Sequence, residues 1–581
     1  EGPTTTIGVP MTGGVFTVGT SSSDFETIQD AIDEMECAGI GGAVTFKIAK
    51  GTYSGRWALD NIPGASSTNT ITFQSASGEP TDVILTNSAG LYGDAHTFQV
   101  KNTNYVRLRG ITFEGTGGYA WPLHVWTSRH LKVDRCVFDP NAGTSTTSSK
   151  IGVVVNTSAT SYSYGGLGHS DSLTFDSCAI IDAGYIGFVM NGVSNSITNK
   201  TKGLIFSNNT VTANYRGLWL QYIGGSVIDN NIITMNSATS LGYTAMYLYY
   251  NGASTDRGQQ IINNQVYGCA NQAIAMTQCD NTSTNRGLFA NNVITRTSGT
   301  NQLIGVYNNG GDYWDFFHNT IDLDKTSYTG GVYSMYTTGS NTNIRNNSFT
   351  ISASTVSTSS YTLYHPNTPN TSTYKLNNNN YYHKRGTFLF YAGGGRNKTN
   401  FNTYSTVADN NSVNVAPNPS SSPVYLLNQE LLFGKGDSTG TTKDIESATR
   451  PVTMPTIGAL EINPDLNVMS VASDSACGTM NSAATVSVTF KNEGDIIQQA
   501  ARFNVSVDTF APVLVTITGP FAKGMTYTRT LPITVDLSGT TANVITVTNA
   551  DGDVDASDNS ASTSVPYWAY PVSSFTQSDS C

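Results

Sequence analysis

The stretch Phe206-Ser207-Asn208-Asn209-Thr210-Val211 places an Asn-Asn doublet between apolar residues, and this phrase returns throughout the middle of the chain. The second Asn marks the copies at Asn209, Asn231, Asn264, Asn292 and Asn347. Asn319 marks a copy in which His318 takes the place of the first Asn, and Asn379 marks a degenerate copy. The spacings are 22, 33, 28, 27, 28 and 32 residues. A constant motif separated by segments of variable length indicates a stack of equivalent units whose loops differ in length.

One unit contains three short apolar strands and no helix. After Asn209, a strand starts at Val211, a second covers residues 217–220, and a third at Val227 leads into the next doublet. This composition predicts an all-β fold built as a right-handed parallel β-helix. We expect the first Asn to adopt the left-handed conformation of a tight corner. The second Asn is predicted to point inward and to stack on its counterpart one strand spacing away, about 4.8 Å.

The motif also occurs upstream, with cysteine in place of the second Asn. Val133-Asp134-Arg135-Cys136-Val137-Phe138 and Phe175-Asp176-Ser177-Cys178-Ala179-Ile180 match it. Adjacent turns of a β-helix hold their Cα atoms within the range that a disulfide permits. Cys136 and Cys178 are therefore predicted either to form a bridge between turns or to be two buried thiols that replace Asn, and the sequence does not decide.

Both ends of such a stack need covers. Residues 24–38, with Asp24 as the expected N-cap, have one apolar face at helical spacing and predict a capping helix. We predict an N-terminal strand segment over 1–23, the capped β-helix over 24–395 and its closing region over 396–462. Residues 463–581 alternate apolar and polar positions between turns, which predicts an antiparallel, immunoglobulin-like β-sandwich. Cys477 and Cys581 are candidates for a terminal disulfide in an oxidising compartment.

Composition excludes some classes of function. Only 12% of the 581 residues are charged, the formal net charge is −11, and no block of Lys or Arg occurs. Nucleic-acid binding is disfavoured, because neutralising phosphates needs a basic surface. No apolar run approaches the roughly 20 residues that span a bilayer. The chain begins Glu1-Gly2-Pro3 without a leader sequence, which we interpret as a mature, exported form.

Several segments resemble secreted proteins with the pectin-lyase-like parallel β-helix. They include Phe16-Thr17-Val18-Gly19, Gly42-Ala43-Val44-Thr45-Phe46, Ile62-Pro63-Gly64 and Ile457-Gly458-Ala459-Leu460-Glu461. The pattern is similar to surface proteins of Bacteroidetes type, and the tail resembles a CARDB-like sandwich domain. The resemblance implies a secreted or cell-surface location. It leaves activity open, because polysaccharide lyases, hydrolases and adhesins share the fold.

A line of aspartates at one position of successive turns is a candidate for a catalytic or Ca²⁺-binding set. Asp134, Asp176 and Asp229 lie two residues before the marker in their turns, but Ser207 interrupts them. A solvated corner and a weak Ca²⁺ site both account for this line. Asp551, Asp553 and Asp555 have a loose Ca²⁺-loop spacing, and an acidic turn between strands is the alternative. No cofactor is assigned with certainty, and Ca²⁺ is the candidate.

Aromatic residues give the strongest signal that the repeat does not explain. Trp219, Tyr247, Tyr307 and Tyr333 are expected to point outward from the second strand of their turns, with Ala275 interrupting the stripe. Such a stripe suits sugar rings or another protein surface, unless loops cover it.

The sequence therefore favours a structural or adhesive surface protein without catalysis. Its expected partners are extracellular polysaccharide, other surface proteins or further copies of itself in an oligomer or filament. The alternative is a polysaccharide lyase or glycoside hydrolase whose site is assembled from loops.

Overall fold

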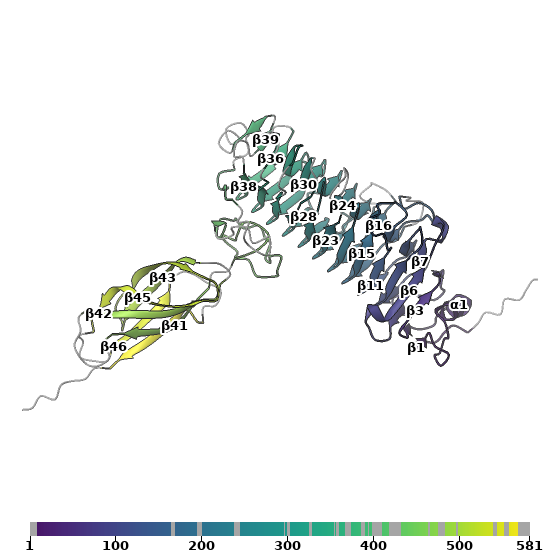
Figure 1. The fold of residues 1–581 in the computed structure, drawn as a ribbon, viewed down its shortest axis with the longest axis horizontal. Coiled ribbons are helices and arrows are strands. Elements are labelled where there is room, and N and C mark those ends of the chain that lie inside the picture. The colour runs from purple at the N-terminus through teal and green to yellow at the C-terminus, as the bar shows by residue number, and fades with distance from the viewer. Residues whose placement is uncertain are drawn as a thin grey trace, which may run out of the picture. The chain divides into compact units, whose positions relative to one another are not determined.

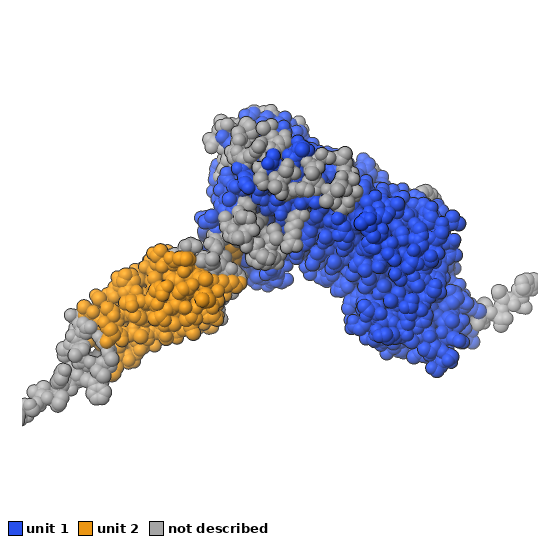
Figure 2. All heavy atoms as spheres, in the orientation of Figure 1, with its two compact units in different colours: residues 1–461 blue, residues 462–581 orange. Residues whose placement is uncertain are grey.

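The chain forms two compact units, residues 1–461 and residues 462–581 (Figure 2). The computed structural model describes residues 9–163, 169–193, 200–236, 244–295, 297–298, 302–324, 328–353, 355, 359–366, 374–384, 390–392, 394–397, 409–416, 431–462, 465–474, 483–494, 498–537, 543–550 and 557–566. Within these residues, the fold has no helix of the length and apolarity that crossing a membrane requires.

The first unit is a parallel β-helix of about 12 turns, in which each turn adds one strand to each of three sheets (Figure 1). Figure 1 shows the strands stacked from β1 beside the N-terminal helix to β39 at the opposite end. The predicted all-β class and the three-strand turn are confirmed. Sheet 1 precedes the Asn corner, sheet 2 follows it, and sheet 3 completes the turn.

Sheet 1 comprises β1 (Gly14–Val18), β2 (Val44–Ile48), β5 (Ile71–Ser75), β8 (Val106–Arg109), β11 (Lys132–Asp134), β14 (Thr174–Asp176), β18 (Ile205–Ser207), β22 (Val227–Asp229), β25 (Gln260–Ile262), β28 (Gly287–Ala290), β31 (Trp314–Phe317), β34 (Thr342–Arg345) and β37 (Tyr374–Asn377). Sheet 2 comprises β3 (Gly51–Ser54), β6 (Val83–Asn87), β9 (Thr112–Gly115), β12 (Val137–Asp139), β15 (Ala179–Ala183), β19 (Thr210–Ala213), β23 (Ile232–Met235), β26 (Gln265–Tyr267), β29 (Val293–Thr295), β32 (Thr320–Asp322), β35 (Ser348–Ile351) and β38 (Asn380–His383).

Sheet 3 comprises β4 (Trp57–Asp60), β7 (His96–Lys101), β10 (Trp121–Trp126), β13 (Ile151–Val155), β16 (Ile186–Asn191), β20 (Arg216–Gln221), β24 (Thr244–Tyr249), β27 (Gln272–Thr277), β30 (Leu303–Asn309), β33 (Val332–Thr337), β36 (Tyr361–His365), β39 (Phe390–Ala392) and β40 (Gly395–Arg396). A short side pair joins β17 (Thr201–Lys202) to β21 (Ile223–Gly224), and two 3₁₀ turns cover Pro80–Asp82 and Tyr92–Asp94.

The corner between sheets 1 and 2 repeats one geometry. The first Asn of the doublet has positive φ in turn after turn, for example 58° at Asn208 and 53° at Asn230, which confirms the expected left-handed corner. The second Asn points inward. The Oδ1 of Asn231 accepts hydrogen bonds from the backbone N–H (2.9 Å) and the Nδ2 (3.1 Å) of Asn209, whose Nδ2 also donates to the Phe175 carbonyl (3.0 Å).

The same bonds link each ladder Asn to the next through Asn264, Asn292, Asn319, Asn347 and Asn379. At the downstream end the Asn379 backbone N–H donates to Ser412 Oγ at 2.7 Å. All of these side chains are buried, so the ladder gives buried amides the partners that they need.

Cys136 and Cys178 lie on adjacent turns at the ladder position, because β11 pairs with β14 in register. Both are free, buried thiols, and the Cys178 backbone N–H donates to Asn209 Oδ1. The disulfide alternative is therefore wrong in this structure, and two thiols take the place of ladder amides. Burial raises the pKa of Cys136 to about 12, so its thiol stays protonated.

Native thiol labelling should separate the described cysteines by exposure. We expect a maleimide to modify Cys37, which is exposed, and to leave Cys136, Cys178, Cys269 and Cys279 unmodified until denaturant is added. Peptide mass spectrometry after labelling measures this. Rapid native labelling of Cys136 or Cys178 would contradict their burial.

The capping helix α1 covers Ile28–Ala38, later than the sequence suggested. Its N-cap is Thr27, whose hydroxyl accepts from the Asp30 backbone N–H while Asp30 accepts from the Thr27 N–H. Asp24 as N-cap is wrong, because that carboxylate instead accepts from the N–H and hydroxyl of Thr17. The apolar face of α1 is buried as expected.

Residues 431–461 form a closing strap that packs along the Asn corner of the later turns. Asn291 donates to the Lys443 carbonyl at 2.7 Å, and Asn378 donates to the Lys435 carbonyl at 2.7 Å. Arg450 and Glu461 form an ion pair of 2.8 Å with both side chains fully buried.

The second unit contains two antiparallel sheets around one apolar core. The first sheet holds β41 (Leu466–Ser473), β42 (Ala484–Asn492) and β45 (Thr526–Val535). The second holds β43 (Gln498–Val507), β44 (Val513–Phe521), β46 (Asn543–Asn549) and β47 (Ser560–Val565).

Candidate functional site

The predicted aromatic stripe lies on the outer face of sheet 3, with one change of residue. Trp219 pairs with Tyr247, Tyr247 with Ala275, and Ala275 with Tyr307. The next residue in this column is Tyr336, because Ile304 is the partner of Tyr333. Tyr333 as the continuation of the stripe is therefore wrong. It lies in a neighbouring outward column, and Tyr364 and Tyr391 continue the stripe after Tyr336.

The rings of this column are packed against one another. Tyr336 and Tyr364 stack at 5.0 Å between ring centroids, and Tyr364 and Tyr391 at 4.5 Å, with interplanar angles of 14° and 11°. Ring faces that stack on each other are not offered to a sugar. Burial raises the pKa of Tyr336 and Tyr364, as expected for half-buried hydroxyls.

The rings at the other end of the stripe are also packed against neighbouring side chains. The Arg216 guanidinium lies 4.4 Å from the Trp219 ring centroid and 4.3 Å from that of Tyr247. Tyr162 packs against Trp219 at 5.7 Å. These contacts favour the interpretation that the stripe stabilises the outer surface of sheet 3.

The line of carboxylates is aligned as predicted on the outer face of sheet 1. Asp134 pairs with Asp176, Asp176 with Ser207, and Ser207 with Asp229. Asp134 is held by Arg109 at 2.9 Å. Asp176 accepts from the Ser207 hydroxyl at 2.9 Å, so these groups bond to neighbouring turns.

The remaining predicted sites lie outside the described residues. Asp551, Asp553 and Asp555 belong to that part of the chain, as do Cys477 and Cys581. Within the described residues, no three His, Cys, Asp or Glu side chains gather in a way that could hold a metal ion.

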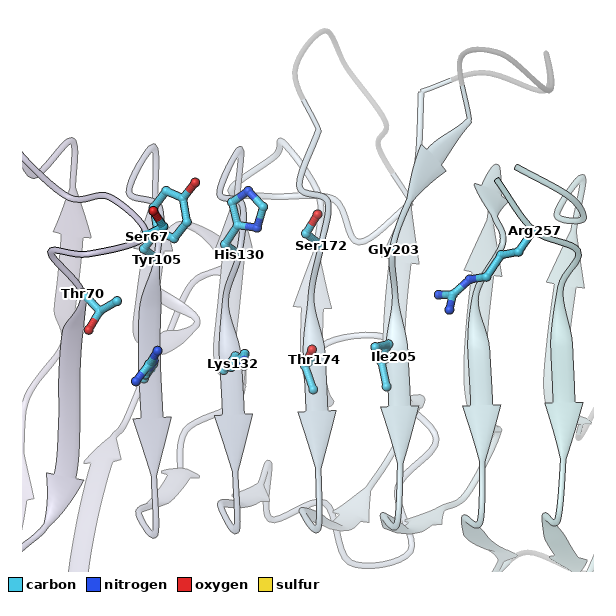
Figure 3. A pocket seen from close by; sticks show the side chains of 11 residues that line it. Ser67, Thr70, Tyr105, His130, Lys132, Ser172, Thr174, Gly203, Ile205 and Arg257 are labelled. Atoms are coloured by element: carbon cyan, nitrogen blue, oxygen red, sulfur yellow. The ribbon is translucent and has the colours of Figure 1, made fainter. Parts of the chain in front are cut away.

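A recess that the sequence did not predict lies on the outer face of sheet 1 across β5, β8, β11, β14 and β18. Two adjoining hollows of about 400 Å³ and 630 Å³ share Arg107, Lys132, Thr174 and Ile205 in their linings, and we call them together the sheet 1 groove. Figure 3 shows Lys132, Thr174 and Ile205 on successive strands, with Arg257 reaching towards them from a later turn.

Arg107 and Lys132 are the cations of this groove that have no partner among the residues that the structure describes. They are Cα partners on adjacent strands, so they lie about one strand spacing, ~4.8 Å, apart. Both are exposed, and neither forms an ion pair or hydrogen bond within the described part of the chain. Arg109, by contrast, is neutralised by Asp134. The groove thus keeps uncompensated positive charge in a chain with a net charge of −11.

An aromatic pair forms the upper edge of the groove. Tyr105 and His130 occupy equivalent corner positions with φ of 57° and 56°, and their rings stack at 4.5 Å with an interplanar angle of 12°. Figure 3 shows them side by side above the row that contains Lys132. The backbone of these corners is fixed by the β-helix, so the pair is held in place before any ligand arrives.

The groove combines paired cations, ring edges and hydroxyls along a rigid strip. Such a strip can bind an extended anion whose charges repeat along the β-helix axis. Sequence reasoning missed this site because its residues come from separate turns without a shared phrase. The sequence does contain a signal for this alignment. Arg107 directly precedes the core residue Leu108, and Lys132 directly precedes Val133, which is the core residue at the same position of the next turn.

No family model matches the sequence, and no curated protein matches it. Among solved structures, Escherichia coli ybhc has a TM-score of 0.27 at 11% identity, covering 52% of this chain and 74% of its own. A double mutant of the periplasmic alginate epimerase AlgG has 0.28 at 9%, covering 64% and 75%. The enzymatically active domain of bacteriophage CBA120 tailspike protein 2 has 0.23 at 12%, covering 96% and 76%. These values describe a distant similarity of fold and carry no information on activity.

Proposed function

We propose that this protein is a secreted or cell-surface β-helix protein that binds an acidic extracellular polysaccharide along the sheet 1 groove without cleaving it. The observation that supports the proposal is the pair of unpartnered cations, Arg107 and Lys132, on adjacent strands of a recessed and rigid face. Carboxylate or sulfate groups on successive sugars meet one cation per turn. Hydroxyls such as that of Thr174, which also lines the groove, can accept and donate hydrogen bonds to the sugar ring.

Neutralising the two cations should weaken binding selectively. We expect the double variant Arg107→Gln/Lys132→Gln to bind an acidic polysaccharide about tenfold more weakly, since each exposed charge pair contributes up to about 1 kcal/mol. The residual difference should vanish at high salt, because exposed charges are screened. Isothermal titration against polyuronate, sulfated and neutral polysaccharides measures this.

Lys375 provides a matched control for that experiment. It occupies the same outward column of sheet 1, is exposed, and lies several turns away on β37. Lys375→Gln should leave the affinity unchanged. Equal binding of neutral and acidic polysaccharide, or equal loss in the Lys375→Gln variant, would contradict a role for the groove.

The second candidate function is a polysaccharide lyase, and the stacked Tyr105–His130 pair beside the cations favours it. Arg107 and Lys132 would neutralise a uronate carboxylate, which makes the adjacent carbon acid easier to deprotonate. His130 would then remove the proton from the carbon beside the carboxylate. The electron pair would form a double bond to the next ring carbon, whose bond to the glycosidic oxygen would break, and Tyr105 would protonate that leaving oxygen. Ultraviolet absorbance of unsaturated products decides between the two candidates. Product release that is lost in His130→Gln would overturn the non-catalytic proposal.

A further inference from the structure

The closing strap shows how the Asn corner binds a peptide. The amide of Asn346 pairs in both directions with the strap backbone, donating from Nδ2 to the Asp437 carbonyl (2.6 Å) and accepting at Oδ1 from the Asp437 N–H (2.9 Å). Asn291 similarly donates to the Lys443 carbonyl. An outward Asn in the left-handed conformation therefore acts as a docking point for extended backbone, in the way that an edge strand does.

The same corner continues beyond the strap without cover. Asn208 and Asn230 have the same positive φ and are exposed, whereas Asn291 and Asn346 under the strap are buried. Ile232 is 39% exposed, although Val293 in the same column of sheet 2 is fully buried against the strap. We call residues 208–232 at this edge the uncovered corner.

The charge beside the corner changes sign between the two stretches. Under the strap, Arg345 forms an ion pair of 3.0 Å with Asp437. Beside the uncovered corner, the equivalent column of sheet 1 holds Asp176, Ser207 and Asp229. A segment that docks there therefore needs a cation where the strap has an aspartate.

We propose that the uncovered corner binds an extended peptide segment of another protein that carries Lys or Arg facing Asp229 and an aliphatic side chain against Ile232. The contact continues the interface that the strap already makes, using the same backbone–amide pairing. Asp176 lines the sheet 1 groove as well, but Asp229, Asn230 and Ile232, on which the docking depends, do not line it, so the proposal does not rest on polysaccharide binding.

A strap-derived peptide tests this proposal on the full chain. The probe is a synthetic peptide of residues 432–446 with Asp437→Lys, compared with the natural sequence, in a fluorescence anisotropy titration. We expect the Asp437→Lys peptide to bind about two- to fivefold more tightly, as one added exposed charge pair allows. Asp229→Asn should remove that preference, and Asn230→Gly, which keeps the positive φ, should weaken binding of both peptides.

The chain offers a matched control for the Asn230 substitution. Asn141 is exposed and has a φ of 50°, so Asn141→Gly makes the same change far along the stack and should leave binding unaffected. Absence of saturable binding at millimolar peptide would overturn the proposal. So would binding that survives Asn230→Gly and Asp229→Asn but is lost in Arg107→Gln/Lys132→Gln, since that pattern places the peptide in the sheet 1 groove.

Discussion

Asn292→Ala is expected to lower the free energy of unfolding by about 3–5 kcal/mol, which is far more than an average substitution. The Asn292 carboxamide accepts from the backbone N–H (3.1 Å) and Nδ2 (3.0 Å) of Asn264 and donates to the Ile261 carbonyl (2.8 Å). Alanine leaves the buried Asn264 backbone N–H without this acceptor and takes one hydrogen bond each from the Asn264 Nδ2, which keeps the Ile228 and Ile262 carbonyls, and from the Ile261 carbonyl. A buried group left unsatisfied costs about 1–3 kcal/mol, and the lost ladder bonds add to this. Denaturant unfolding followed by circular dichroism measures the loss.

Hydrogen exchange locates the same effect in the chain. The Asn264 amide and the turns on either side of residue 292 should exchange faster, while α1 and the first turns remain protected. Thr212→Ala serves as the control, because Thr212 faces outward on β19 and makes no side-chain hydrogen bond in the described residues. Equal stability of the two variants would show that the ladder does not contribute as its geometry implies.

Removing one partner of the buried ion pair in the strap should have the second large effect. Arg450 contacts Glu461 at 2.8 Å and also donates to Asn291 Oδ1 at 3.0 Å and to the Gly458 carbonyl at 2.9 Å. Arg450→Met leaves the Glu461 carboxylate buried and unpaired, which costs about 3–5 kcal/mol. We expect the strap to detach, so that residues 431–461 become protease-sensitive and lose hydrogen-exchange protection.

Two further variants test whether the effect of Arg450→Met is specific to the buried ion pair. The double variant Arg450→Met/Glu461→Leu should recover part of the loss, because it removes both charges from the interior. Lys50→Met breaks the exposed pair of Lys50 and Asp82 (2.7 Å) and should leave the strap unchanged. A strap that stays protected in Arg450→Met would contradict its dependence on the ion pair.

The repeat made most of the β-helix predictable, because each Asn doublet fixes one corner and therefore the register of the turns around it. This register correctly placed Cys136 over Cys178 and aligned Asp134 with Asp176. It also fixed which stretches form strands, since the apolar residues flanking each doublet face the core.

Sheet 3 was harder to predict because its strands do not alternate simply. In β20 the outward residues Arg216 and Trp219 are three apart, with Gly217 between them. A Cβ on Gly217 would lie 2.5 Å from Ile233 Cγ2, so this position must stay small. In β33 the corresponding outward residues are Tyr333 and Tyr336, and composition alone does not tell which one follows Tyr307.

The sheet 1 groove was harder still, because it depends on pairing between turns upstream of the Asn doublets. Arg107 and Lys132 stand in segments whose phrase has lost its Asn, so their alignment follows from the strands and not from a repeated residue. That no described residue forms an ion pair with these two cations is a three-dimensional property. The numbers of acidic and basic residues in the sequence do not reveal this pair of cations, because the protein is acidic as a whole.

The Asn ladder has a direction as well as a length. Every Nδ2 donates to the Oδ1 of the following Asn, so the carboxamide dipoles point the same way from Asn209 to Asn379. Aligned dipoles polarise one another, so the column behaves as a polar rod within the apolar core. Its two ends differ in chemistry, since Cys178 supplies a donor at the first and Ser412 an acceptor at the last. Turns added to this column would therefore have to match its polarity, which makes the two termini of the stack chemically non-interchangeable.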